Sequence, residues 1–258
     1  MSHFYHIIIY NPLLNALIFL ISVLPGHSLG MAIIILTIII RLIFSPLYHK
    51  SIMAQEAMKQ IQPKIKEIQK KYKNNRKQQG EKLMELYRQY KINPFSSFLY
   101  MLIQLPVLIA LYQILIHLNV GSGVGIYSFI HYPLTMTTIF LGFINLNQKS
   151  ILIGLLAGFF QFCQGKIMEA RQNHKSDAEA FNKYSKKEPQ QVMMNFTRQM
   201  NYIMPLITFL IAWRLPAGVG LFWTTMTLFS VFQELWINRQ LKLNSKLVQP
   251  SMEMTDKK

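Results

Sequence analysis

The sequence predicts an all-α membrane protein with five transmembrane helices, and three features of its composition support this fold class. Hydrophobic residues make up 51% of the 258 residues and charged residues only 15%, whereas soluble domains carry about 25% charged residues. Residues 1–40 and residues 95–148 contain no Asp, Glu, Lys or Arg. A soluble fold could not remove two such stretches from water and still present a polar surface. The formal net charge of +16 is concentrated between the apolar stretches.

The same composition excludes several classes of protein. A chain with this apolar content is not intrinsically disordered, and its one cysteine, Cys163, cannot build a disulfide scaffold. The two charge-free stretches exclude an ordinary cytosolic enzyme. Because the basic residues are confined to a few segments, we expect no direct nucleic-acid partner.

Five segments are long and apolar enough to be predicted as spans, since a helix needs about 20 mostly apolar residues to cross a bilayer. The third is short, but the uncharged residues before it extend it. The fourth contains Pro205, which neighbouring helices can accommodate in a membrane. The predicted spans are residues 29–48, 94–118, 149–167, 199–215 and 216–238.

Basic residues predict the orientation of these spans. Residues 49–93 carry 12 Lys and Arg, residues 166–200 carry 7 and residues 239–258 carry 5, which is 24 of the 27 in the chain. Basic loops stay in the cytosol. We therefore expect a cytosolic hairpin at 49–93, a cytosolic loop at 168–198 and a basic cytosolic tail at 239–258. We expect the uncharged loop 119–148 and the turn at 215–218 to lie on the external side.

The N-terminal segment, residues 1–28, is predicted as an amphipathic helix lying in the outer membrane interface. Its apolar stretch is interrupted by Asn11, Pro12 and Asn15 and ends at Pro25-Gly26. It lacks the basic start of a secretory signal and the composition of a transit peptide. The alternative is a sixth span, which would need a cytosolic N-terminus without Lys or Arg to hold it there.

The cytosolic segment 49–93 has the pattern of a helical hairpin, in which apolar residues recur at spacings of three and four. We expect Pro63 to kink or break the first helix and a polar turn at residues 73–80 to be closed by Gly80. The hairpin either fixes topology only or docks a nascent chain, a partner protein or anionic lipid headgroups. The first helix contributes Met53, Ala57, Ile61, Ile65, Ile68 and Tyr72, and the second Leu83, Leu86 or Tyr87, and Tyr90.

No motif for catalysis, a cofactor or a metal is apparent. The glycine-rich segment 121–125 lacks the Lys-Ser/Thr that follows in a phosphate-binding loop. His3 and His6 have no third ligand beside them, so they are a weak metal signal. Cys163 lies in an apolar span, where a thiol usually serves packing. The sequence therefore predicts no enzyme, no cofactor and no metal site.

Arg41 is the residue that most needs a function, because it lies inside the first predicted span. An arginine at the centre of a membrane helix costs about 2.5–3.5 kcal/mol on insertion scales, and such residues normally face a partner or a wet cavity. A structural pair with Glu234, near the inner end of the last span, is one alternative. The interpretation we favour is a hydrophilic groove inside the bundle, with Thr37 on the same helix face as Arg41.

Polar side chains in the other spans extend this candidate groove. Taken singly, each would more often serve hydrogen bonding between helices. The candidate lining residues are Gln104, Gln161, Gln164, Trp223, Thr224 and Thr227.

Several short stretches, in this order and spacing, resemble the YidC-type membrane protein insertases of the Oxa/Albino family. The resemblance covers roughly residues 10–240. The stretches are 37–41 with Pro46, 62–65, 93–94, 103–106, 156–158 with Gln164 and Lys166, and 216–218.

The resemblance implies a groove that is open to the cytosol and to lipid and closed to the outside. It assigns Arg41 and Thr37 to the groove, together with Gln164 and the aromatic Trp223. It implies an insertase of the bacterial inner membrane whose partners are nascent membrane proteins and lipids, with the Sec translocon and the ribosome as further candidates. A small-solute transporter and a folding chaperone without insertase activity are the alternatives.

Overall fold

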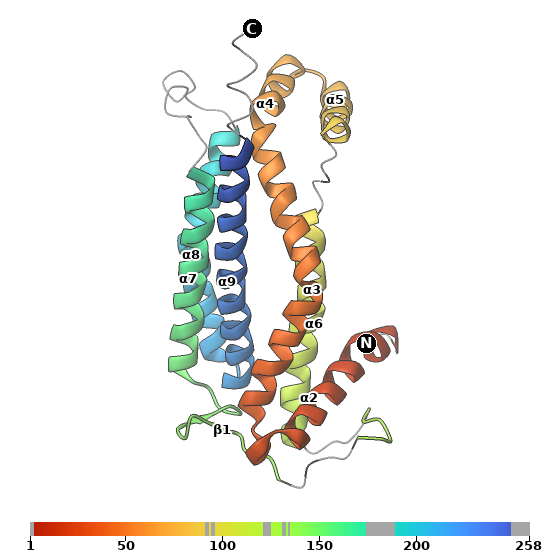
Figure 1. The fold of residues 1–258 in the computed structure, drawn as a ribbon, viewed down its shortest axis with the longest axis vertical. Coiled ribbons are helices and arrows are strands. Elements are labelled where there is room, and N and C mark those ends of the chain that lie inside the picture. The colour runs from red at the N-terminus through yellow and green to blue at the C-terminus, as the bar shows by residue number, and fades with distance from the viewer. Residues whose placement is uncertain are drawn as a thin grey trace. The chain divides into compact units, whose positions relative to one another are not determined.

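The computed structural model describes residues 3–90, 93, 96–120, 125–130, 133, 135–173 and 189–248. The described chain is mostly helical (Figure 1), and it forms two compact units, Met1–Arg41 with Leu111–Lys258 and Leu42–Ala110. The elements are α1 His3–Tyr5, the π-helix η1 His6–Tyr10, α2 Asn11–Val23, the 3₁₀ turn η2 Pro25–His27, α3 Leu29–Gln60, α4 Gln62–Lys71, α5 Arg76–Gln89, α6 Ser96–Val120, β1 Ile139–Phe140, β2 Ile144–Asn145, α7 Ile151–Asn173, α8 Pro189–Arg214 and α9 Ala217–Val248.

Helices occupy all five predicted spans, as α3, α6, α7, α8 and α9. Among the described residues, three helices are long and apolar enough to cross a membrane: His3–Val23, Leu29–Met58 and Ile151–Ala170. Two shorter apolar helices, Gln104–Leu118 and Tyr202–Arg214, fall in other predicted spans. The count of five spans therefore stays a prediction. Residues 121–124 of the external loop, 174–188 of the cytosolic loop and 249–258 of the tail lie outside the described residues.

The N-terminal helix ends where the sequence predicts, but it lacks the expected polar face. Leu24 is extended, and Gly26 takes a positive φ of 71° that closes the turn into α3. One face is buried through Tyr10, Leu14, Leu17, Ile18 and Ile21. The opposite face is also apolar, with Phe4, Ile7, Ile8, Phe19 and Val23 exposed. A helix that is apolar on both faces favours lipid around it, so its interfacial or spanning position stays a prediction.

Hydrogen bonds hold this helix to the chain around the end of α6. The Asn15 side-chain amide donates to the Gly125 carbonyl at 2.8 Å, and the Tyr127 backbone N–H donates to Asn15 Oδ1 at 2.7 Å. The Tyr10 hydroxyl lies 3.1 Å from His117 Nδ1. The asparagine that interrupts the apolar stretch is therefore a buried anchor, 2% exposed.

The hairpin predicted at 49–93 is present within the Leu42–Ala110 unit, with one difference and with the expected break near Pro63. α3 continues to Gln60, so the first span and the first arm of the hairpin form one helix. The chain breaks at Ile61, and Pro63 lies in the first turn of α4, where its missing N–H costs no hydrogen bond. The predicted seam is confirmed for its central members: Ile61 and Leu86 are buried, and packed against them are Ala57, Met58, Ile65, Ile68 and Tyr87.

The expectation that Gly80 closes the turn of the hairpin is wrong. The turn ends at Asn75, whose side chain accepts a hydrogen bond of 3.1 Å from the Gln78 N–H and caps α5. Gly80 lies inside α5, where an added Cβ would meet nothing within 4 Å. An asparagine cap satisfies one of the N–H groups that a helix start leaves unbonded. The start of α5 is therefore determined by Asn75 and not by Gly80.

Small residues bring α7 against α8 and α9, which lie side by side (Figure 1). A Cβ on Gly158 would lie 3.0 Å from Phe209 Cβ and 3.0 Å from the Pro205 carbonyl oxygen of α8. Gly154, one turn earlier, faces Trp213 and Phe209 in the same way. This small-xxx-small spacing lets helix backbones approach where lipid offers no hydrophobic driving force. α8 continues through Pro205.

Part of the predicted external loop forms a cap that is hydrogen-bonded to the starts of α3 and α9. Thr137 accepts from the Leu29 N–H and donates to the His27 carbonyl, both at 3.0 Å. Gly218 N–H donates to the Leu146 carbonyl at 2.9 Å. Between these contacts β1 and β2 pair antiparallel, two short strands that the all-α prediction omitted. The start of α3, the turn before α9 and this loop therefore meet at one end of the unit.

The first prediction compares two glycine-to-alanine substitutions. Gly158→Ala should lower the free energy of unfolding by about 1–3 kcal/mol, the usual cost of overpacking, because its Cβ would press on the α8 backbone. Gly80→Ala should raise it by up to about 1 kcal/mol, since alanine is the better helix former. Thermal unfolding of the purified protein in detergent measures both. Equal shifts in the same direction would contradict the close α7–α8 contact.

Candidate functional site

Arg41 is buried, 6% exposed, and hydrogen-bonded to the last helix. Its Nη2 group donates to the Met226 carbonyl at 2.9 Å and to Ser230 Oγ at 2.5 Å. Ser230 Oγ in turn donates to the same Met226 carbonyl at 3.0 Å. The guanidinium from the middle of α3 is thus fixed against one turn of α9.

The face of α9 near this contact is polar although the helix around it is apolar. Thr224 is 7% exposed, and Thr227, Ser230 and Glu234 are each 1% exposed. Thr227 and Ser230 are three residues apart and Ser230 and Glu234 four, so they follow one face of the helix. Buried hydroxyls and a carboxylate are costly in an apolar bundle unless other groups use them.

Two of the predicted lining residues use their hydroxyls locally. Thr37 is 1% exposed and its Oγ1 donates to the Ile33 carbonyl at 2.6 Å. Thr224 Oγ1 donates to the Gly220 carbonyl at 2.8 Å. Both bonds run to the residue four earlier in the same helix, a common arrangement for hydroxyls in membrane helices. The hydroxyl hydrogens of these threonines are therefore used within their own helices, while the oxygen atoms keep acceptor capacity.

The structure unites only some of the predicted site residues. Arg41 and the polar face of α9 meet directly. Gln161 and Gln164 on α7 and Trp223 on α9 are half-buried in the same unit. Gln104 is half-buried in the other unit. Their part in a shared groove stays a prediction.

Sequence reasoning missed the residues that hold the guanidinium. Ser230 follows Thr227 by three positions and could have been found by extending the polar face of the last span by one turn. The Met226 carbonyl carries no sequence signal, because any residue supplies the same group. Glu234, the alternative partner that the sequence offers for Arg41, is among the most buried polar residues described.

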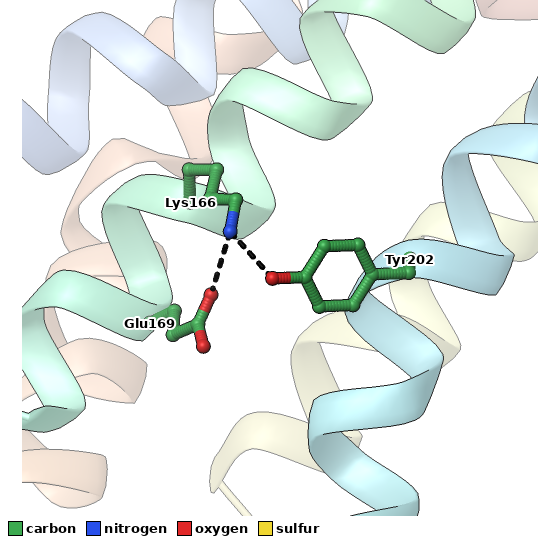
Figure 2. A network of polar contacts seen from close by, with 3 residues as sticks. All are labelled: Lys166, Glu169 and Tyr202. Carbon is green, nitrogen blue, oxygen red and sulfur yellow. Dashed lines mark hydrogen bonds and ion pairs between the residues drawn. The ribbon is translucent and has the colours of Figure 1, made fainter.

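A second polar cluster joins α7 to α8 near the basic ends of these helices. Figure 2 shows Lys166 between the Glu169 carboxylate of its own helix and the Tyr202 hydroxyl of α8. Lys166 Nζ lies 3.3 Å from Glu169 Oε2 and 2.6 Å from the Tyr202 oxygen, and 4.5 Å from the centre of the Tyr202 ring. Lys166 and Tyr202 are exposed, and lysine and tyrosine side chains are typical of a membrane boundary.

The chemistry available to the Arg41 site is binding. Among the described residues no group of three or more His, Cys, Asp or Glu could hold a metal ion. Arginine offers a permanent positive charge and several donors in a planar fork that suits carboxylates. The site can therefore attract and orient an anionic or polar group.

Comparison with known proteins gives a consistent result. A family model described as "60Kd inner membrane protein" matches residues 20–245. The membrane protein insertase YidC of Clostridium tetani is 34% identical over 209 residues, which cover 81% of this chain and 81% of that protein. YidC of Oceanobacillus iheyensis is 32% identical, covering 84% of this chain and 77% of that protein. YidC of Fusobacterium nucleatum is 30% identical, covering 90% and 98%.

A solved structure is similar in fold. It is described as an active YidC insertase crystal structure with the first transmembrane domain resolved, and the match has a TM-score of 0.52 at 24% identity. The match covers 89% of this chain and 46% of that one. At this identity the match is a statement about fold.

The second prediction concerns the contact that fixes Arg41. Ser230→Ala should lower the free energy of unfolding by about 1–2 kcal/mol, because it removes a buried acceptor of a charged donor. Thr225→Ala is the matched control, since Thr225 Oγ1 donates to the Leu221 carbonyl of its own helix, and it should cost less than about 1 kcal/mol. Denaturant unfolding in detergent measures both. A smaller effect at Ser230 than at Thr225 would contradict the assigned role.

Proposed function

Because the chain belongs to the 60Kd inner membrane protein family, we propose that it inserts membrane proteins into the bacterial inner membrane by capturing the hydrophilic tails of its clients beside Arg41. The relatives described above are named membrane protein insertases. The observation that carries the capture step is the buried guanidinium held against the polar face of α9. Clients are nascent membrane proteins, and the Sec translocon and the ribosome are further proposed partners.

Capture begins when an acidic or polar tail enters the groove from the cytosol. At about 4 Å and an effective dielectric constant near 20, a pair of unit charges gains roughly 4 kcal/mol before desolvation is subtracted. The net gain is smaller, which suits transient binding. Arg41 is oriented for this step by Ser230 and Met226, so its side chain loses little conformational entropy when the tail binds.

Release into the bilayer needs no nucleotide and no covalent step. The apolar segment of the client leaves water for lipid, a transfer worth about 25 cal/mol per Å² of buried apolar surface. The membrane potential acts on acidic residues that cross with the tail. Water in the groove shortens the apolar distance that the tail must cross, and the groove stays closed to the outside.

The proposed topology follows the distribution of basic residues. The hairpin of α4 and α5, the loop between α7 and α8 and the tail after α9 lie in the cytosol, and the capped end with β1 and β2 faces outside. The exposed lysines of the hairpin, including Lys70, Lys77 and Lys82, support a surface for anionic lipid headgroups or an arriving client.

The third prediction tests the charge of the groove. Arg41→Glu should reduce insertion of a single-span reporter with an acidic tail by about tenfold, equivalent to 1.4 kcal/mol, whereas Arg41→Lys should largely preserve it. The measurement is complementation of an insertase-depleted strain, followed by protease protection of the reporter tail. Arg214→Glu is the control with the same charge change, since Arg214 is exposed at the end of α8. Equal insertion by Arg41→Glu and the parent protein would remove the electrostatic step.

The fourth prediction tests whether the groove is wet. In a Cys163→Ala background, cysteines at positions 37, 41, 164 and 223 should react with a water-soluble thiol reagent added from the cytosolic side. Position 153 is the control, because Ile153 packs against Gly220 in the contact between α7 and α9 and is not a proposed lining residue. Protection at all four test positions would mean a dry bundle without a groove.

A further inference from the structure

Glu234 is a buried carboxylate that the proposed capture step does not use. It is 1% exposed on α9, inside the last predicted span, where ionisable side chains are rare and usually functional. Burial of a carboxylate in an apolar helix bundle costs free energy, unless another group in the site interacts with it.

Its position along α9 relates it to Arg41. Met226, Ser230 and Glu234 follow one another at intervals of four residues, so their side chains lie on one face of the helix, one turn apart. Arg41 Nη2 is bonded to the first two positions of this series. The carboxylate therefore lies one turn further along the face that holds the guanidinium.

We propose that Glu234 is a specificity-determining residue of the groove, which offsets part of the charge of Arg41 and so lets the groove accept client tails of low or mixed charge as well as acidic ones. This inference rests on the proposed insertase function. A groove with arginine alone would favour acidic tails and repel basic ones. With a carboxylate one turn away, an acidic tail must compete for the guanidinium, and a lysine or arginine of the client finds an acceptor.

The physical basis is the partial shielding of both charges from bulk water. At an effective dielectric constant near 20, two charges one helical turn apart interact about four times as strongly as they do in bulk water. An exposed carboxylate elsewhere in the chain would be screened by solvent and salt and would not influence the tail. The effect should therefore belong to Glu234 and not to the net charge of the protein.

The test uses the full chain in proteoliposomes with two single-span reporters that differ only in the tail, one with two Asp and one with two Lys. Glu234→Gln should raise the ratio of acidic to basic reporter inserted by about threefold or more. Glu234→Asp keeps the charge and should leave the ratio near that of the parent. Glu169→Gln is the matched control, because it makes the same charge change at Lys166 and should not alter the ratio.

Each outcome distinguishes this inference from the proposed function. If the parent protein inserts both reporters and Glu234→Gln leaves the ratio unchanged, the specificity role is wrong while the insertase function stands. If the parent inserts neither reporter, the proposed function is wrong and this inference with it. An equal shift in Glu169→Gln would assign the effect to net charge and also overturn the role. If the Gln variant accumulates poorly, Glu234→Met removes the carboxylate at similar volume and gives the same comparison.

Discussion

The site depends on one arginine that a membrane helix would not ordinarily keep. A buried guanidinium is tolerated only where acceptors replace the water it has lost. Here the Met226 carbonyl and Ser230 Oγ provide them, at 2.9 and 2.5 Å from Arg41 Nη2. Because one of these bonds is to a backbone carbonyl, the position of Arg41 depends on the backbone of α9 as well as on its side chains. A permanent charge is thereby held in a fixed place beside the polar face of α9.

The remaining structure positions α9 so that this contact can form. In lipid, close approach of helices replaces the hydrophobic effect as the source of helix association, and Gly154 and Gly158 provide that approach between α7 and α8. Gly220 packs against Ile153 of α7, and the cap around residues 137–149 bonds the start of α9 at Ala217 and Gly218. The helix that carries Ser230 is therefore fixed at its start and along its side.

The features of the fold and of the site that depend on neighbouring residues in the chain could be predicted from the sequence. The apolar seam of the hairpin followed from residue spacing, and Ile61 with Leu86 forms its buried centre. Arg41 was identified because a charge among apolar residues needs a reason. Gly80 was misplaced because the Asn75 cap competes with glycine for the helix boundary. The N-terminal helix was expected to be amphipathic, but sequence periodicity cannot tell a face buried by protein from one exposed to lipid when both are apolar.

The membrane class, the helical segments and the presence of a charge that needs partners can be read from the sequence, because they depend on composition and on the short-range periods of the helix. The groups that surround this charge are set by the packing of the helices. The Met226 carbonyl has no residue-specific signal, and Ser230 and Glu234 gain their meaning from lying on the face of α9 that Arg41 reaches. Such a pairing joins residues almost 190 positions apart, so no local pattern in the chain encodes it.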